Sequence, residues 1–462
     1  MHYEAPADPS CGISTSPANM TAPSPRPRRP STSPDSYAVI GGEGFLGAAL
    51  VSALLERHPA ARVASFGLTQ RRFDTSSGEP YRFFRTDITS YDSVLASLRD
   101  SEVTTVFHTA SPHAKSTPDM WRSVNVDGTD AVVRACQEAG VRKLVFTSSM
   151  TVVYEAGIAY KNVDERLPII ETEEKVATYA GTKASAEKIV LAANGKNGLK
   201  TCSLRLGGII GPGDRQVLPG FIEVYKSGQS IFQMGDDLNL FDFVTLKNVV
   251  HAHLLAADRL DSPPISAKPL VSRLEPVQCT IKRRRLPTSL HQDVVDPSKP
   301  PPQADPPLPA MRNRWNQFAC SDDEPIDASN LSVAGQAFFI TNGEPVTFWT
   351  FARAVYFAYS QKPPRWWDPI VLPKSVGMLY AQLSETIGRF QGKKPEDCAV
   401  PTAHMQYVLH DLYFDIERAR RVLGYEPIES LEDGIKTGVE WYKADEARQA
   451  QRSAAADQGK KK

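Results

Sequence analysis

Tyr179 and Lys183 stand four residues apart in the segment YAGTK. On a helix this spacing places both side chains on one face. A free tyrosine, with a pKa of about 10, is a poor base at neutral pH. A neighbouring ammonium favours the phenolate and lowers that pKa, so the pair could take a proton from an alcohol group. An ordinary amphipathic helix can contain the same spacing, and the pair therefore needs support from its surroundings.

Two further polar residues stand beside segments with strand or helix patterns. Ser149 lies in FTSSMTV, directly after the apolar run KLVF. The carboxyl end of a central parallel strand is where such sheets bind ligands, so Ser149 could hold a substrate oxygen. The alternative is that Ser148 or Ser149 caps a turn or a helix. Asn125 lies in SVNVDGT, before a helix that continues through Val132, and could equally be a local cap.

Glycines recur at intervals of three in IGGEGFLGAAL, residues 40–50, at Gly41, Gly44 and Gly47. The loop follows an apolar strand and leads into a helix, so its backbone N–H groups and the helix dipole would face a bound phosphate. This context predicts a cradle for a dinucleotide pyrophosphate. Glu43 lies inside the loop. Because an inward carboxylate would repel the pyrophosphate, we expect its side chain to point to solvent.

The composition argues against several classes of partner and site. Lysine plus arginine and aspartate plus glutamate each number 53 in 462 residues, so the net charge gives no reason to expect nucleic acid. The six cysteines are scattered without a CxxC pair, which predicts neither a disulfide framework nor a metal site. The sequence shows no secretory signal, and no apolar stretch approaches the ~18 residues that span a bilayer. We expect a soluble protein that at most attaches to a membrane face.

The elements that position these residues alternate along the chain. Apolar, β-branched runs predict strands over residues 37–42, 61–66, 104–110, 143–149 and 200–206. Amphipathic patterns predict helices over residues 45–58, 91–99, 121–139 and 179–193. This alternation predicts an α/β fold, a Rossmann-type doubly wound parallel sheet covered on both faces. A smaller, mostly helical C-terminal part should complete the substrate site.

Composition divides the chain into five segments. We expect a disordered tail over 1–36, an NAD(P)-binding Rossmann domain over 37–260, a Pro-rich and basic insert over 261–331, a C-terminal substrate-binding part over 332–443, and a polar tail over 444–462. The first tail and the insert lack periodicity, so both are predicted to be disordered. An insert this long is unusual in a compact domain. A surface loop, a regulatory insertion and a gene-model error such as a translated intron all stay open.

Together and in this order, the motifs resemble those of the extended short-chain dehydrogenase/reductase superfamily. They comprise the glycine loop, HTAS, NVDGT, FTSS, YAGTK, GPGD and, after the insert, FDIERARRVLGYEP and SLEDGIKTGVEWY. The phrases FTSSMTVVYEAG, GPGDRQVLPGFIEVYKSGQ and DFVTLKNVVHAHLLAA are most similar to the 3β-hydroxysteroid dehydrogenase family. Within this family, the motifs are most similar to those of the branch that acts on sterol 4α-carboxylates. The resemblance implies NAD(P)-dependent oxidation of a sterol 3β-hydroxyl, with loss of CO2 in that branch.

The resemblance also implies a role for each matched polar residue. Tyr179 would be the general base, and Lys183 would hold the nicotinamide ribose and keep the phenolate accessible. Ser149 would hydrogen-bond the reacting oxygen. Asn125 would organise the neighbouring strand and a proton-relay water. No metal ion is implied.

The cofactor-binding positions that the resemblance implies are Gly41, Gly44, Phe45, Leu46, Gly47, Asp87, Ile88, Ala110 and Lys183. Relatives that use NAD commonly carry an acidic residue where Gly67 stands, to bind the adenine ribose hydroxyls. Its absence removes a group that would repel a 2′-phosphate, which Arg71 or Arg72 could bind. We therefore expect NAD or NADP, with a slight lean to NADP unless both arginines are simply solvated. Leu206 is a second departure, since relatives usually carry proline there.

The second part of the chain should bind the substrate. Residues 365–390 are aromatic and then amphipathic, which suits a lid over a flat apolar sterol, a membrane-facing surface or a helix packed in the core. The resemblance favours peripheral association with the endoplasmic reticulum membrane or lipid droplets over a cytoplasmic location, and a homodimer. Rival functions are a carbonyl reductase, a nucleotide-sugar epimerase or dehydratase, and a catalytically silent dinucleotide sensor.

Overall fold

The computed structural model describes residues 35–73, 80–113, 116–155, 157–170, 178–265, 331–362, 369–392, 398 and 400–460. The described residues belong to one compact unit. The disorder predicted for residues 1–36 and 261–331 concerns segments that lie almost entirely outside the described residues.

A sheet of seven parallel strands forms the centre of this unit, in the order β12-β7-β5-β4-β1-β2-β3. Every residue of the central strands β1 and β4 is buried, because helices cover both faces of a parallel sheet. The strands are β1 (Ser36–Ile40), β2 (Arg62–Gly67), β3 (Tyr81–Arg85), β4 (Thr105–His108), β5 (Lys143–Ser149), β7 (Lys200–Leu206) and β12 (Ala337–Ile340).

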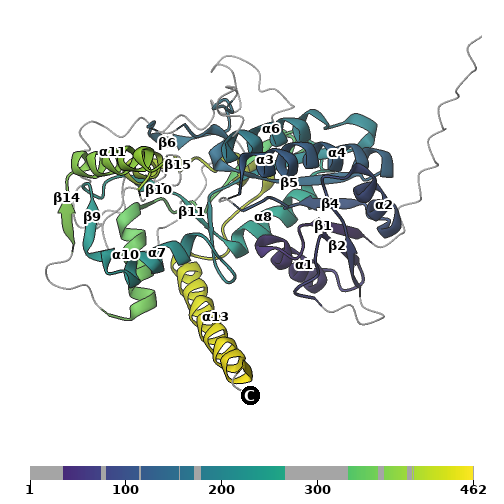
Figure 1. Cartoon of the computed structure of the whole chain (residues 1–462). Coiled ribbons are helices and arrows are strands. Elements are labelled where there is room, and N and C mark those ends of the chain that lie inside the picture. Colours follow the sequence, from purple (N-terminus) through teal and green to yellow (C-terminus); the bar gives the residue numbers. More distant parts are fainter. Residues whose placement is uncertain are drawn as a thin grey trace, which may run out of the picture. The chain divides into compact units, whose positions relative to one another are not determined.

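Helices pack on both faces of the sheet (Figure 1). α1 and α8 contact each other on one face, and α2, α4 and α6 lie in sequence on the other. Two separate apolar clusters result, one containing Leu50 of α1 and Ala256 of α8, the other Val94 of α2 and Val132 of α4. This arrangement confirms the predicted fold class. The helices are α1 (Phe45–Arg57), α2 (Tyr91–Ser101), α4 (Gly128–Ala139), α6 (Tyr179–Ala192) and α8 (Leu246–Arg259).

The predicted strands and helices are present, with ends that differ by a few residues. The helix predicted over 121–139 is more complex, because α3 (Pro118–Trp121), a π-helical segment η1 (Arg122–Asp127) and α4 follow one another. Asn125 lies in η1. π-Helical turns inside longer helices are frequent at functional sites.

A smaller part is built from segments on both sides of the insert. It contains a four-stranded sheet, in the order β13-β10-β15-β6, and the strand pairs β11–β8 and β14–β9. Its strands are β6 (Tyr160–Val163), β8 (Gly208–Ile210), β9 (Phe232–Met234), β10 (Leu240–Phe241), β11 (Phe243–Thr245), β13 (Val346–Thr347), β14 (Ile370–Leu372) and β15 (Leu412–Phe414). Its helices are α7 (Val217–Lys226), α10 (Phe348–Ser360), α11 (Lys374–Phe390), α12 (Thr402–Leu409) and α13 (Leu431–Lys460). α13 packs against α10 and α7, and its C-terminal end projects from them in Figure 1.

The strand β12 does not follow the predicted domain boundary. It lies in the range assigned to the substrate-binding part, 332–443, yet it pairs with β7 as the edge strand of the main sheet. The connection from α8 to β12 contains the insert. The Ile265 N–H donates to the Leu331 carbonyl oxygen at 3.0 Å, so the two described ends of that connection meet. The residues predicted as a polar tail continue α13 as far as Lys460.

Candidate active site

The motifs meet at the carboxyl edge of the central sheet. β1 ends at Ile40 and runs into the glycine loop, β5 ends at Ser149, and α6 begins at Tyr179. Because the strands are parallel, their carboxyl ends share one edge, which is where open α/β sheets bind ligands. α6 contacts both β5 and η1, the segment that carries Asn125. The four residues predicted to be catalytic therefore lie on neighbouring elements.

Tyr179 occupies the first position of α6. Thr178 fixes this start, because its hydroxyl accepts the Gly181 N–H that the helix leaves free. The phenol ring is partly buried and meets the Trp121 ring edge-on, at 6.2 Å between centroids. Burial raises the pKa of the Tyr179 phenol, and a hydrogen bond with the Ser111 side chain opposes that shift.

Lys183 lies one turn further along α6 and is buried. Its Nζ donates to the Thr147 carbonyl oxygen at 2.5 Å and lies 4.2 Å from the centroid of the Phe146 ring. Burial lowers the pKa of the ammonium to about 7, and the carboxylate of Glu187 opposes the shift. Glu187 is itself paired with Arg205, at 2.7 Å. The lysine is therefore anchored to the strand that ends at Ser149.

Asn125 joins three segments rather than capping one. Ser111 Oγ donates to Asn125 Oδ1 at 3.0 Å, and Asn125 Nδ2 donates to Thr182 Oγ1 at 3.1 Å. Thr182 Oγ1 in turn donates to the Tyr179 carbonyl oxygen at 2.9 Å. This chain of hydrogen bonds fixes the first turn of α6 against η1 and the segment after β4.

Ser149 caps a short turn and keeps a free proton. Its Oγ accepts the Thr151 N–H at 3.2 Å and the Thr151 hydroxyl at 2.9 Å, at the start of the 3₁₀ turn η2 (Met150–Val153). Both lone pairs of the oxygen are then occupied, so Ser149 can act towards a ligand only as a donor. Leu206 is its partner in the register of β5 and β7.

The glycine loop has the geometry of a phosphate cradle. Gly41 has a left-handed φ of 84°, and a Cβ atom there would lie 3.0 Å from the backbone of Ala110. A Cβ atom on Gly47 would lie 2.1 Å from the Gly41 carbonyl oxygen, so only glycine lets α1 approach the loop. α1 starts at Phe45, after Gly44, with no side-chain cap and no acidic residue in its first turn. Its first N–H groups fit a pyrophosphate.

The remaining cofactor positions lie in the first turn of α1 and in the segment that follows β3. Leu46 and Ile88 are buried, and Ile88 lies 3.1 Å from the point where a Cβ atom on Gly128 would stand. Asp87 is exposed, and its carboxylate accepts hydrogen bonds from the N–H and hydroxyl of Thr89. Any contact of these three residues with a cofactor stays a prediction.

The prediction that Glu43 points to solvent is wrong. Its side chain is buried, because the residue is only 9% exposed. Its carboxylate accepts hydrogen bonds from the N–H groups of Arg71 and Arg72 and from the Tyr81 hydroxyl. Burial of a carboxylate is tolerated when protein donors replace the water that it loses. Glu43 therefore links the glycine loop to the turn that follows β2.

Arg71 and Arg72 are exposed on that turn, which follows Gly67 at the end of β2. A Cβ atom on Gly213 would lie 4.0 Å from Arg72 Nη1 and 3.2 Å from Phe45 Cδ2. The guanidinium of Arg72 therefore reaches across the start of α1, at the same edge of the sheet as the cradle.

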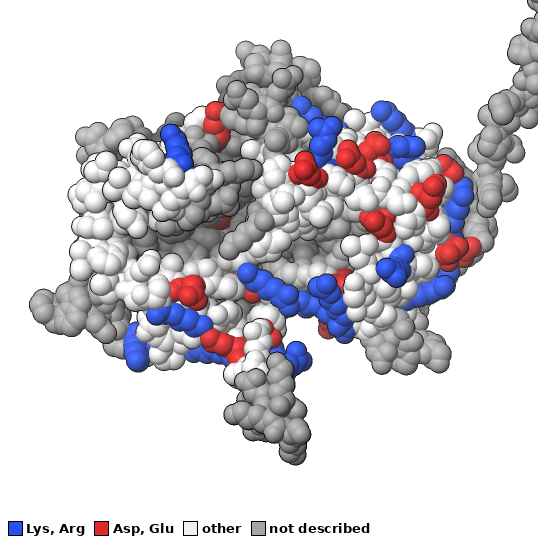
Figure 2. Space-filling view, in the orientation of Figure 1, with Lys and Arg blue, Asp and Glu red and all other residues white. Residues whose placement is uncertain are grey.

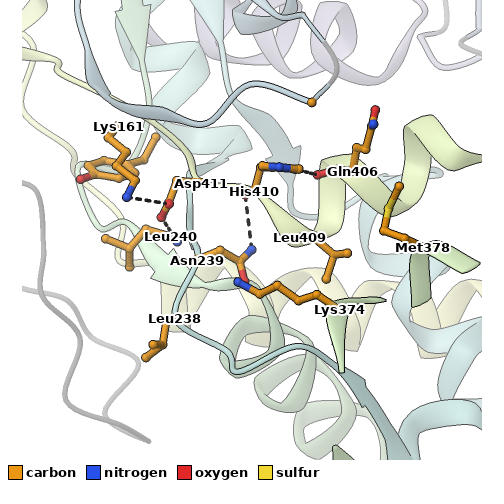
Figure 3. A pocket seen from close by; sticks show the side chains of 12 residues that line it. Lys161, Leu238, Asn239, Leu240, Lys374, Met378, Gln406, Leu409, His410 and Asp411 are labelled. Carbon is orange, nitrogen blue, oxygen red and sulfur yellow. Dashed lines mark hydrogen bonds and ion pairs between the residues drawn. The ribbon is translucent and has the colours of Figure 1, made fainter. Parts of the chain in front are cut away.

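A cavity of about 550 Å³ lies in the smaller part, beside α11 and α12 (Figure 3). Its polar groups pair with their neighbours: Lys161 Nζ lies 3.3 Å from Asp411 Oδ2, and Asn239 Nδ2 donates to the Val408 carbonyl oxygen at 2.7 Å. The lining residues are Gly157, Lys161, Leu238, Asn239, Leu240, Lys374, Met378, Gln406, Leu409, His410, Asp411 and Tyr413. None of the predicted catalytic residues lines this cavity.

α11 turns its large apolar side chains outward. Its small residues Gly377 and Ala381 face α12, where a Cβ atom on Gly377 would lie 3.2 Å from Met405 Sδ. The exposed apolar residues, between 45% and 89% accessible, form what we name the α11 face: Val376, Leu379, Tyr380, Leu383, Ile387 and Phe390. Figure 2 shows few charged side chains over this region. The core-packing alternative is therefore wrong for this helix, whereas residues 363–368 lie outside the described part.

The described ranges contain neither a helix that could span a membrane nor a cluster of metal-ligating side chains. No helix there combines the length and the apolar character that crossing a membrane requires. Within the same residues, no group of three or more His, Cys, Asp or Glu side chains is placed to hold a metal ion.

Sequence reasoning missed several residues that complete the site. Ser111 and Thr182 lie inside motifs that were already singled out, HTAS and YAGTK, so their polar side chains were the available signal. Glu187 follows Lys183 at the same interval of four that separates Lys183 from Tyr179. Thr147 meets Lys183 through its carbonyl group, and a backbone contact leaves no signal in the sequence.

The chain is similar to a defined family over half its length. The model of the 3-beta hydroxysteroid dehydrogenase/isomerase family matches residues 38–273. The decarboxylating sterol-4-alpha-carboxylate 3-dehydrogenase of Schizosaccharomyces pombe is 34% identical over 410 residues, which cover 88% of this chain and 98% of the relative. The enzyme of that name from Saccharomyces cerevisiae is 32% identical, covering 88% and 97%. The one from Homo sapiens is 30% identical, covering 88% and 87%.

Solved structures share the fold at lower identity. UDP-glucose 4-epimerase of Thermotoga maritima aligns with a TM-score of 0.54 and 17% identity, over 89% of this chain and 99% of that chain. The Bordetella bronchiseptica enzyme WbmG, solved in complex with NAD, aligns with a TM-score of 0.54 and 16% identity, over 90% and 96%. At these identities the likeness shows the fold alone.

Proposed function

Because the chain belongs to the 3-beta hydroxysteroid dehydrogenase/isomerase family, we propose that it oxidises the 3β-hydroxyl of a 4α-carboxysterol and releases CO2, a step of sterol C4 demethylation. The observation that carries this proposal is the placement of Tyr179 and Lys183 on α6, at the sheet edge that also holds the glycine cradle. The names of the relatives support the substrate class. The cradle supports NAD(P) as the cofactor.

Tyr179 acts as the general base in this reaction. A hydrogen bond with the Ser111 side chain opposes the rise in the pKa of the phenol, and the protonated Lys183 side chain one turn away supplies positive charge near the phenolate. Tyr179 takes the proton of the C3 hydroxyl while the C3 hydrogen leaves with its electron pair. When bound, the oxidised nicotinamide supplies the acceptor for that hydride.

Ser149 donates its free proton to the C3 oxygen and so orients it. Once C3 is a ketone, the C4 carboxylate belongs to a β-keto acid, and loss of CO2 leaves its electron pair in an enolate. Ser149 and the newly protonated Tyr179 both donate to the C3 oxygen and stabilise its negative charge. Loss of CO2 therefore needs no further acid or base from the protein, and C4 of the enolate then takes a proton from water to give the 3-ketone.

We propose NADP as the preferred cofactor. Gly67 offers no carboxylate at the end of β2, and Arg71 and Arg72 are exposed on the turn that follows. A guanidinium group binds a 2′-phosphate with charge-assisted hydrogen bonds. Steady-state turnover with NADP and with NAD tests this preference, and a large advantage for NAD would contradict it.

The substrate class is tested by cofactor reduction with three alcohols in parallel. A 4α-carboxysterol should be oxidised, and a 3β-hydroxysteroid without the C4 carboxyl should react more slowly. A UDP-hexose should not react. Turnover of the UDP-hexose alone would point to a sugar-nucleotide enzyme. Cofactor binding without turnover of any of the three would point to a silent sensor.

We further propose that the protein attaches peripherally to the endoplasmic reticulum membrane or to lipid droplets through the α11 face. Its exposed apolar residues recur at the helical interval of three or four, as in helices that lie in a membrane interface. Lys374 and Arg389 stand near the two ends of the helix, where their charges can reach headgroups. A sterol substrate would be available from the same lipid phase.

Flotation with phospholipid vesicles tests this attachment. The double variant Leu379→Glu/Leu383→Glu should lose vesicle binding, whereas Gln382→Glu/Thr386→Glu, which adds the same charge at exposed polar positions of α11, should retain it. Equal binding by both variants would contradict the proposal. A homodimer would cover the α11 face instead, and it would appear in light scattering as a dimer that only the leucine variant dissociates.

A further inference from the structure

Glu43 joins the glycine loop to the turn after β2, and no step of the proposed reaction uses it. Its Oε2 accepts the N–H groups of Arg71 at 2.7 Å and Arg72 at 2.6 Å, and its Oε1 accepts the Tyr81 hydroxyl at 2.6 Å. Hydrogen bonds to a carboxylate are among the strongest in proteins. The side chain therefore holds two neighbouring backbone positions in a fixed place relative to the cradle.

Among the described residues, Glu43 supplies the side-chain hydrogen bonds that tie this turn to the rest of the protein. Within the described residues, its other hydrogen bond is internal, from Gln70 Nε2 to the Phe73 carbonyl oxygen at 2.6 Å. The Phe73 ring packs on Tyr81, at 4.9 Å between centroids, and Tyr81 is the third donor to Glu43. Leu68, at the start of the turn, is 65% exposed and adds little burial. Glu43 and Tyr81 thus hold an otherwise exposed turn.

The turn places Arg71 and Arg72 near the expected position of the adenine ribose, where NADP carries the 2′-phosphate that NAD lacks. In Rossmann folds the adenine ribose lies at the end of the second strand, beside the glycine loop. Gly67 ends that strand without an acidic side chain. Arg72 reaches across the start of α1, since its Nη1 and Phe45 Cδ2 both lie within 4.0 Å of the Cβ position of Gly213.

We propose that Glu43 is a positioning residue for recognition of the 2′-phosphate of NADP, because it fixes the backbone from which Arg71 and Arg72 present their guanidinium groups. This inference rests on the proposed preference for NADP. Hydrogen bonding carries the effect, whereas the negative charge of Glu43 by itself opposes a phosphate. Glutamine can preserve the geometry, since its Oε1 can accept both N–H groups and its amide can donate to the Tyr81 oxygen. Alanine cannot.

The test measures dinucleotide affinity and not turnover. NADPH and NADH are titrated against the full-length chain by fluorescence, and adenosine 2′,5′-bisphosphate and 5′-AMP by calorimetry. Glu43→Ala should bind NADPH and the bisphosphate about tenfold or more weakly, while NADH and 5′-AMP change by less than about threefold. Glu43→Gln should stay within about threefold of wild type for all four. Glu56→Ala, which removes an exposed glutamate of α1, serves as the matched control.

Amide hydrogen exchange gives an independent readout. Without ligand, the N–H groups of Arg71 and Arg72 should exchange faster in Glu43→Ala than in wild type, and at the wild-type rate in Glu43→Gln. Should the alanine variant fold poorly, Tyr81→Phe removes only the Oε1 bond, and it should give a smaller loss of the same kind.

Several outcomes would overturn the inference. An equal loss of NADH and NADPH affinity would mean that Glu43 only supports the cradle. Tighter NADPH binding by both the alanine and the glutamine variant would mean that its charge selects against the phosphate. The double variant Arg71→Ala/Arg72→Ala separates this inference from its premise. If it leaves NADPH affinity unchanged, the proposed NADP preference fails; if it weakens NADPH binding while Glu43→Ala does not, only the role of Glu43 fails.

Discussion

In the proposed reaction, Tyr179 can act as a base only with the help of its neighbours. Burial raises the pKa of its phenol, which opposes ionisation, and the Ser111 hydrogen bond acts in the other direction. Lys183 is held one turn away by the Thr147 carbonyl group. In the proposed reaction its protonated form supplies positive charge near the phenolate. The proposed proton transfer therefore depends on the Tyr179 hydroxyl oxygen, whereas its ring packs against Trp121.

Tyr179→Phe keeps that packing and removes the proposed base. We expect kcat/KM for the sterol to fall by about 10³-fold, the range over which general bases act. The dissociation constant for NAD(P)H should change little. Tyr37→Phe is the control, because it removes a buried hydroxyl at the amino end of β1, away from the carboxyl edge. Wild-type turnover by a folded Tyr179→Phe protein would show that another group takes the proton.

The buried Lys183 should make stability depend on pH. Burial lowers its pKa to about 7, from the usual 10.5 of a lysine in water. Above pH 7 the unfolded chain therefore binds more protons at this residue than the native protein, and the free energy of unfolding rises with pH. This contribution to stability is fully present above the pKa that the lysine has in the unfolded chain. It is lost as the pH falls through the pKa that the lysine has in the folded protein.

Lys183→Met removes that dependence. Between pH 7 and pH 9, the free energy of unfolding of wild type, relative to that of the variant, should rise by about 1 kcal/mol per pH unit. Urea denaturation at three pH values measures the difference. Parallel curves for the two proteins would show that the lysine keeps its proton in the fold.

At the level of elements, the contact between α1 and the glycine loop is the tightest constraint. A Cβ atom on Gly47 would lie 2.1 Å from the Gly41 carbonyl oxygen, and backbone cannot yield as a flexible side chain does. Gly47→Ala should lower the free energy of unfolding by about 2 kcal/mol or more, as overpacking does. It should also weaken NAD(P)H binding, because α1 would be displaced from the cradle.

Gly220→Ala in α7 is the matched control for this change. It places the same methyl group in a helix where nothing lies within 4 Å of the new Cβ atom. Stability there should stay equal or rise by up to about 1 kcal/mol, since alanine favours helix over glycine. Denaturant titration of both variants measures the difference, and equal losses of stability would contradict the account of the α1 contact.

The elements themselves could be predicted because their signals are local. Strand and helix periodicity placed β1, β5 and α6, and the interval of four placed Tyr179 and Lys183 on one face. The π-helical segment around Asn125 could not be predicted, because it depends on hydrogen bonds with Ser111 and Thr182 that lie far away in sequence. The direction of the Glu43 side chain could not be predicted for the same reason, since its hydrogen-bond donors lie 28 to 38 residues away in the sequence.

At the scale of the whole molecule, contacts between segments far apart in the sequence determine where β12 and α11 lie, and such contacts could not be predicted from the sequence. In the sequence, β12 is an apolar run at the start of the predicted substrate-binding part. Only its pairing with β7 places it in the main sheet. The exposed face of α11 was equally ambiguous, because an amphipathic pattern does not say which side meets the protein. Gly377 and Ala381 settle it, since their small side chains allow close approach to α12.

The segment between α8 and β12 should be removable without loss of the fold. Ile265 and Leu331 share a hydrogen bond of 3.0 Å, so a linker of about four residues can replace residues 266–330. We expect the shortened protein to keep its melting temperature within about 5 °C and its affinity for NAD(P)H. Calorimetry and fluorescence titration measure both quantities. Failure to fold would assign the segment a structural role.

The most direct test of the central claim follows both products of one turnover. A 4α-carboxysterol labelled in the carboxyl carbon is supplied with NAD(P), and reduced cofactor and released CO2 are measured together. Oxidation at C3 followed by loss of the β-keto carboxylate predicts equal molar amounts of the two, both abolished in Tyr179→Phe. Reduced cofactor without CO2, or CO2 that persists in the Tyr179→Phe protein, would contradict it.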